Sequence, residues 1–110
     1  MGWLKRKTAE IEPQGIDPNL CLYVIGFTEE RFAGIVKIGV TNNIKKRLKT
    51  LQTGNPWRLQ VMAIVYRPDA FQLEAALHRH FDAQRMRPDG EWFRFDPDSD
   101  PVEIVARAAQ

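Results

Sequence analysis

The sequence predicts an α+β domain: a small, mainly antiparallel, three-stranded sheet with flanking helices, in the order β-β-α-β-α. Two apolar runs, residues 20–25 and 35–40, are rich in β-branched residues, have the length of strands and are bounded by glycines. The connection between them, from Gly26 to Gly34, suits an antiparallel hairpin, because a parallel crossover needs a dozen or more residues. A helical pattern follows the second run at once, and strands mixed with helices in this way indicate a sheet with helices packed on it.

The first helix is expected to begin after Thr41, Asn42 or Asn43, each of which can act as its N-cap, and to end near Gly54. Apolar residues at three- and four-residue spacing form a stripe along it: Ile44, Leu48 and Leu51. Arg47 lies at the edge of that stripe, where packing can hold it beside a cleft. The other basic residues of this helix point away from the stripe: Lys45, Lys46 and Lys49.

The rest of the chain continues the same pattern. Residues 58–66 are expected to form the third strand, and Pro68 suits the first turn of a second helix. The apolar face of that helix is expected to contain Leu73, Ala76, Leu77 and Phe81. Residues 91–95 alternate as a further short strand does, and a capped final helix is expected over residues 101–109. Residues 1–18 have little periodicity and are interpreted as a flexible N-terminal arm, which leaves residues 19–110 as a single domain.

Composition sets limits on the function. A chain of 110 residues with 44% hydrophobic residues is long enough for one domain with a real core. The net charge of +2 says little about nucleic acid, although the basic residues crowd the first helix. Cys21 is the only cysteine, which excludes an internal disulfide and a cysteine-based metal cage. No apolar run approaches a membrane span and no secretory signal is recognisable, so we expect a cytoplasmic protein.

The second helix carries one acid that could hold a metal. Glu74 and His78 are four residues apart and therefore share one helical face, just outside the apolar stripe. They could form an ordinary surface pair, or Glu74 could offer its carboxylate to a hard divalent cation, which prefers oxygen ligands. A zinc site is not favoured, because His78 and His80 point to different faces and no cysteine pattern accompanies them.

Taken in order, the motifs resemble those of the GIY-YIG endonuclease superfamily. Leu22-Tyr23-Val24 resembles the first motif, and Lys37-Ile38-Gly39 resembles the second motif of the short phage- and fungus-type branch, which reads KIG. Arg47 in the following helix and Glu74 in the later helix complete the pattern, together with a Gly-Glu-Trp-Phe segment at residues 90–93. The resemblance covers roughly residues 20–95. Single motifs of this length are weak signals, whereas their order and spacing are fairly specific.

The resemblance implies a metal-dependent phosphodiesterase cleft that acts on DNA. Tyr23 matches the first-motif tyrosine, Arg47 the arginine that grips phosphate, and Glu74 the single metal-binding carboxylate, for Mg²⁺ or Mn²⁺. Lys37 occupies the place of the second-motif tyrosine, and this departure is compatible with an altered proton transfer or with an inactive member. His78 and Glu91 form a second tier.

The same roles follow from chemistry. Arg47 offers a permanent cation whose fork suits phosphate oxygens. A phenol such as Tyr23 is mostly protonated at neutral pH, and a cation beside it, for which Lys37 is a candidate, would lower its pKa. Each residue also has a purely structural alternative: packing for Tyr23, an ammonium extended to solvent for Lys37, and a cap on the preceding turn for Glu91.

Three functions are compatible with these residues. The first is a metal-dependent DNA endonuclease of low intrinsic sequence specificity. DNA shape, a recruiting protein partner or formation of a homodimer would then determine which DNA it cuts. The second is a catalytically silent nucleic-acid-binding module, in which Lys45, Lys46 and Lys49 govern a salt-sensitive affinity. The third is a protein-interaction domain without DNA binding. The joint presence of Tyr23 and Glu74 with Arg47 favours the first, and the sequence does not choose between DNA and RNA.

Overall fold

The computed structural model describes residues 17–110, which form a four-stranded sheet between helices. The strands are β1 (Cys21–Phe27), β2 (Ile35–Thr41), β3 (Leu59–Tyr66) and β4 (Trp92–Arg94). The α-helices are α1 (Ile44–Gln52), α2 (Ala70–His80) and α3 (Pro101–Ala108). Two short 3-10 helices are η1 (Glu30–Phe32) and η2 (Asp82–Gln84). The predicted α+β class is confirmed.

The sheet has the strand order β3-β1-β2-β4, and every pairing is antiparallel. The predicted hairpin is present: β1 and β2 pair with Tyr23 directly opposite Gly39. The sheet has one strand more than the three counted in the predicted order, because the short alternating segment after Gly90 pairs with β2 as β4. Gly34 closes the hairpin connection with a φ of 89°, a conformation that favours glycine.

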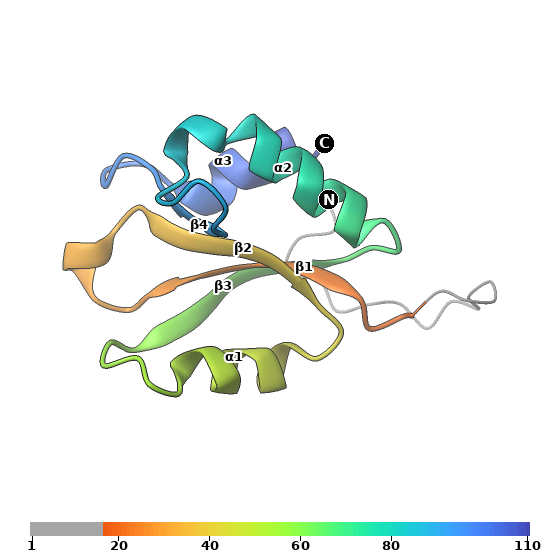
Figure 1. The fold of residues 1–110 in the computed structure, drawn as a ribbon, viewed down its shortest axis with the longest axis horizontal. Coiled ribbons are helices and arrows are strands. Elements are labelled where there is room, and N and C mark those ends of the chain that lie inside the picture. Colours follow the sequence, from red (N-terminus) through yellow and green to blue (C-terminus); the bar gives the residue numbers. More distant parts are fainter. Residues whose placement is uncertain (1–16) are drawn as a thin grey trace.

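The two faces of the sheet are covered by different helices. Figure 1 shows α1 below the sheet and α2 with α3 above it. Side chains alternate along the buried central strand, so Leu22 and Val24 join the core under α2 and α3, whereas Tyr23 and Ile25 join the core against α1. The central strand therefore supplies side chains to both cores.

The edge of β2 is only partly covered. β4 pairs with Ile35, Val36 and Lys37 alone, so the second half of β2 has no neighbouring strand on that side. An uncovered strand edge presents backbone N–H and C=O groups that need other partners. In this protein the Ile38 N–H binds the Glu91 carbonyl oxygen, and the carbonyl groups of Ile38 and Val40 bind side chains of the two helical layers. This edge is therefore the place where the two layers meet.

The helix ends agree with the sequence prediction in most respects. The Asn43 side chain caps α1 by accepting a hydrogen bond from the Lys46 N–H at 3.1 Å. The Asp100 side chain caps α3 in the same way. Pro68 differs from the prediction, because it lies before α2 and outside its first turn. Ala76 also differs: it is exposed, although it was predicted to lie on the apolar face of α2.

Most of the predicted N-terminal arm lies outside the described residues, since only its last two positions belong to the range 17–110. Within that range no helix has the length and apolar character that crossing a membrane requires. Cys21 is buried as a free thiol in β1, as its apolar surroundings in the sequence predict.

Candidate active site

The Tyr23 side chain is completely buried, and its hydroxyl meets the arginine of α1. Arg47 Nη1 donates a hydrogen bond to Tyr23 Oη at 3.0 Å and approaches the Val40 carbonyl oxygen at 3.4 Å. Gly39, directly opposite Tyr23 on β2, leaves room for the phenol, because a side chain at that position would collide with the hydroxyl and with the ring carbons beside it. The glycine of the second motif therefore has a physical reason: it makes space for the tyrosine of the first.

Lys37 lies on the same face of β2 as Gly39, two residues away along the strand. Its ammonium donates a hydrogen bond to Glu91 Oε1 at 2.5 Å. Only 11% of the Lys37 side chain is exposed, compared with 42% of the Glu91 side chain. The Glu91 backbone is fixed independently, because its carbonyl oxygen accepts a hydrogen bond from the Ile38 N–H at 3.1 Å.

Glu74 and His78 approach from α2, on the opposite face of the sheet. The two side chains are largely enclosed, with 18% and 14% exposed, and His78 Nε2 lies 4.0 Å from Glu74 Oε2. His78 Nε2 is also 2.9 Å from the Ile38 carbonyl oxygen, which can only accept, so Nε2 carries a proton. Arg85 Nη2 donates to the His78 carbonyl oxygen at 2.9 Å and thereby ties the end of α2 to the segment before β4.

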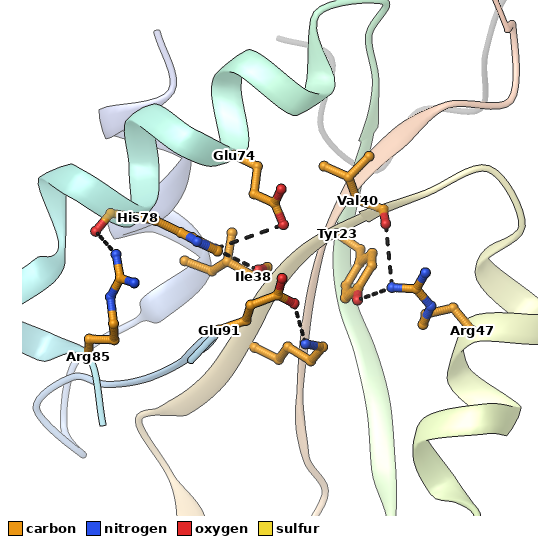
Figure 2. Close-up of polar contacts among 9 residues, drawn as sticks. Tyr23, Ile38, Val40, Arg47, Glu74, His78, Arg85 and Glu91 are labelled. Carbon is orange, nitrogen blue, oxygen red and sulfur yellow. Dashed lines mark hydrogen bonds and ion pairs between the residues drawn. The ribbon is translucent and has the colours of Figure 1, made fainter. Parts of the chain in front are cut away.

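The open edge of β2 joins these groups into one site. The carbonyl groups of Ile38 and Val40 anchor His78 from one layer and Arg47 from the other. Figure 2 shows Glu74 reaching from α2 towards the side chain of Glu91, with the Tyr23 ring and Arg47 beside them. The structure thus brings together all six residues of the two predicted tiers: Tyr23, Lys37, Arg47, Glu74, His78 and Glu91.

Burial and mutual repulsion shift the pKa of two of these groups. Burial raises the pKa of Tyr23 above its ordinary value; the hydrogen bond from Arg47 opposes this rise, and the charges of Glu91 and Glu74 add to it. Burial also raises the pKa of Glu74, and the neighbouring charge of Glu91 raises it further. The prediction that Lys37 is the cation beside the phenol is not met, because the cation in contact with Tyr23 is Arg47 and Lys37 is paired with Glu91.

The residues fit a hard divalent cation that keeps most of its ligands as water. Within residues 17–110 no group of three or more His, Cys, Asp or Glu side chains forms a complete cage. Mg²⁺ and Mn²⁺ need no such cage, since one or two carboxylates plus water and substrate oxygens suffice for Mg²⁺ and the same oxygen ligands suit Mn²⁺. Glu74 is a largely enclosed carboxylate that repels a second carboxylate, Glu91, and a cation between them would relieve that repulsion.

The three predicted DNA-binding lysines are exposed on α1: Lys45, Lys46 and Lys49. Arg47 differs from them as predicted, because it is half-buried and points to the site. Sequence reasoning did not identify the carbonyl groups of Ile38 and Val40 as anchors. Every residue has a backbone carbonyl group, so the residue type gives no signal for this role. Arg85 was not among the predicted site residues, and in the structure it supports His78 through a hydrogen bond to the His78 carbonyl oxygen.

A model of the T5orf172 domain family matches residues 20–108. The chain belongs to this family. The T5orf172 domain is a nuclease-related domain of the GIY-YIG-like kind, so the resemblance inferred from the motifs is confirmed at the level of the superfamily. Membership indicates a nuclease-like or nucleic-acid-binding module. No curated protein and no solved structure matches the chain.

Proposed function

We propose that this T5orf172 domain is a divalent-metal-dependent endonuclease that hydrolyses phosphodiester bonds of DNA with low intrinsic sequence specificity. From its Lys37-Ile38-Gly39 motif we also infer that it belongs to the short KIG branch. One observation carries the proposal. The hydrogen-bonded pair of Tyr23 and Arg47 on one face of the sheet lies close enough to the enclosed carboxylate of Glu74, on the other face, for their charges to interact. A phenol, a guanidinium and a carboxylate that converge from separate elements can supply the proton transfer, the charge neutralisation and the metal binding that phosphodiester hydrolysis uses.

Each side chain has a distinct role in this reaction. Arg47 binds the phosphoryl oxygens through the N–H groups that it does not direct at Tyr23 or Val40, and neutralises charge as it develops there. Glu74 would hold the Mg²⁺ or Mn²⁺ ion, which supplies Lewis acidity for the leaving oxygen. His78 and Arg85 keep the α2 side of the site in position.

Tyr23 handles the proton of the attacking water. Its hydroxyl oxygen accepts from Arg47 Nη1, so its own proton is free to point into the site. Burial favours the protonated phenol, and Arg47 stabilises the phenolate once the proton has left. Tyr23 can thus accept a proton from water only in those molecules in which it is a phenolate, and the fraction of these molecules grows with pH.

A silent nucleic-acid-binding module is the second candidate, and one observation favours it. Lys37 stands where the second motif has a tyrosine, and its ammonium is bound to Glu91 and so does not face Tyr23. In that case the exposed lysines of α1 would hold nucleic acid without cutting it. In either case a small domain of this kind depends on DNA shape, on self-association as a homodimer or on a recruiting protein partner for its choice of site.

The decisive experiment is the conversion of supercoiled plasmid to nicked or linear DNA in the presence of Mg²⁺, Mn²⁺ or EDTA. Wild-type protein is compared with Glu74→Ala and with Glu103→Ala, a matched change at an exposed carboxylate on α3. We expect metal-dependent nicking by the wild type and by Glu103→Ala, and loss of nicking in folded Glu74→Ala. The absence of cutting by all three, with retention of DNA at low salt, would instead establish the silent module.

A further inference from the structure

Lys37 is an enclosed cation that is paired with a partly exposed carboxylate. Its ammonium donates a hydrogen bond to Glu91 Oε1, and only 11% of the Lys37 side chain is exposed, compared with 42% of the Glu91 side chain. An enclosed ammonium needs a counter-charge, and Glu91 supplies it here. The cation is therefore held at the site by a carboxylate that is itself accessible.

Glu91 can change partners without a change in the fold. Its backbone is held at the start of β4 by the hydrogen bond from the Ile38 N–H, and 42% of its side chain is exposed. The carboxylate therefore moves by side-chain rotation alone. Figure 2 shows this carboxylate and that of Glu74 directed towards the same space, and the two charges are close enough to repel each other.

We propose that Lys37 is an exchangeable counter-ion for Glu91: it neutralises Glu91 while no divalent cation is bound, and Glu91 turns from Lys37 to the cation held by Glu74 when one binds. This proposal rests on the proposed function and deepens it. Each stage leaves one charge uncompensated, that of Glu74 before the exchange and that of Lys37 after it. Before the exchange the Lys37 ammonium offsets Glu91, and after it Glu74 and Glu91 together offset a divalent cation. The released ammonium then faces the substrate phosphate, on the same side of β2 as Tyr23.

The exchange differs physically from a permanent structural ion pair. If Lys37 competes with the metal for Glu91, removal of Lys37 makes metal binding tighter, because Glu91 no longer has to leave a partner. If the pair is only structural, removal of Lys37 changes metal affinity only through the loss of its charge near the site, and that gain persists when Glu91 is replaced. The dependence of the gain on Glu91 therefore separates the two.

The test measures binding of Mn²⁺ to the full chain without DNA, by electron paramagnetic resonance of the free ion. We expect Lys37→Met, which keeps most of the length of the side chain and removes its charge, to bind Mn²⁺ about fivefold more tightly than the wild type. Lys37→Arg retains the charge and grips a carboxylate through two N–H groups, so it is expected to bind Mn²⁺ no more tightly than the wild type. Lys49→Met removes an exposed charge of α1 and controls for net charge.

The Glu91→Gln variant completes a double-mutant cycle. We expect Glu91→Gln alone to weaken Mn²⁺ binding about fivefold. In the Glu91→Gln background, Lys37→Met is expected to increase the affinity for Mn²⁺ no more than Lys49→Met does. Unchanged or weaker binding in Lys37→Met overturns the proposal, as does a gain that persists in the Glu91→Gln background. If Lys37→Met fails to fold, tighter Mn²⁺ binding by Lys37→Arg overturns it equally.

The outcomes also separate this proposal from the proposed function. A wild type that nicks plasmid, but whose Mn²⁺ affinity is indifferent to Lys37, overturns the exchange and leaves the nuclease intact. A wild type that binds Mn²⁺ with the expected dependence on Lys37, but never cuts DNA, supports the exchange and removes the nuclease. A wild type that binds no Mn²⁺ at millimolar concentration overturns the exchange.

Discussion

Arg47 Nη1 donates a hydrogen bond to the Tyr23 hydroxyl at 3.0 Å, and this contact ties the central strand to the helix that covers one face of the sheet. It gives a buried phenol a polar partner, and it holds a guanidinium at the uncovered edge of β2. The pair therefore serves the fold and the candidate chemistry at once, and the two contributions can be separated by mutation.

Tyr23→Phe removes the hydroxyl and keeps the ring. Because the proton of the attacking water then has no acceptor at this position, we expect the rate of plasmid nicking to fall by about 10²-fold or more. Burial raises the pKa of Tyr23 above its ordinary value of 10.0, so the phenolate fraction of the wild type still grows at pH 9. The wild-type nicking rate should accordingly rise from pH 7 to pH 9 without a plateau, and the rate of the variant should not.

Tyr66→Phe is the matched control, since it removes the only other tyrosine hydroxyl, on β3, away from Arg47. Its nicking rate and pH profile should equal those of the wild type. A Tyr23→Phe protein that is folded and retains the wild-type rate would contradict a proton-transfer role and leave Tyr23 as a packing residue.

The positions of Tyr23 and Arg47 could be predicted from the sequence because both follow local periods. Strand alternation assigns Tyr23 to one face, and the helical period places Arg47 at the edge of its stripe. The contact between Lys37 and Glu91 could not be predicted in this way. It depends on the register of β4 against β2, and a strand of three residues has too few positions for a pattern to fix its partner.

The anchors of the site were beyond sequence reasoning for a different reason. The carbonyl groups of Ile38 and Val40 act only because β4 is too short to cover them, and backbone groups look alike at every position. His78 was identified from its spacing to Glu74, but its contact with Ile38 follows from the approach of α2 to the sheet, which is a tertiary property. Local pattern thus predicted the residues, and the sheet edge determined how they meet.

Gly39→Ala tests the fit between the two motifs. The added methyl group would collide with the Tyr23 hydroxyl and ring, which cannot move freely in a fully buried position. Overpacking of this kind is expected to lower the free energy of unfolding by about 1–3 kcal/mol, measured by urea denaturation. Gly90→Ala is the control, because its nearest neighbour would lie at an ordinary contact distance of 3.4 Å. Equal stability of the two variants would show that the phenol can yield.

Glu74→Gln should stabilise the metal-free protein. Burial and the charge of Glu91 raise the pKa of Glu74 above its ordinary value of 4.5, so the folded protein holds this proton more tightly than the unfolded chain does. Once the pH is above the raised pKa, the carboxylate is ionised in both states, and its charge then favours unfolding. We expect a higher Tm for Glu74→Gln than for the wild type at pH 7 in EDTA.

The pH dependence provides a second measurement of the same effect. The contribution of Glu74 to stability is fully present below its ordinary pKa and is lost as the pH rises through its raised pKa in the folded protein. The difference in Tm between Glu74→Gln and the wild type should therefore shrink as the pH is lowered through that window. A lower Tm for Glu74→Gln at pH 7 would indicate that attraction to His78 and nearby cations outweighs burial.

The exposed lysines of α1 allow nucleic-acid binding to be separated from cutting. Lys45, Lys46 and Lys49 lie on the outer side of the helix whose inner side carries Arg47, so each can bind a phosphate without entering the site. Replacing any one of them with Gln should reduce the slope of log affinity against log salt concentration by about 0.9 for each phosphate that the variant no longer neutralises, measured by fluorescence anisotropy with duplex DNA. The nicking rate at saturating protein and low salt should stay close to that of the wild type, because the substitution leaves Tyr23, Arg47 and Glu74 in place. Salt slopes equal to that of the wild type in all three variants would mean that DNA approaches the site from the α2 side.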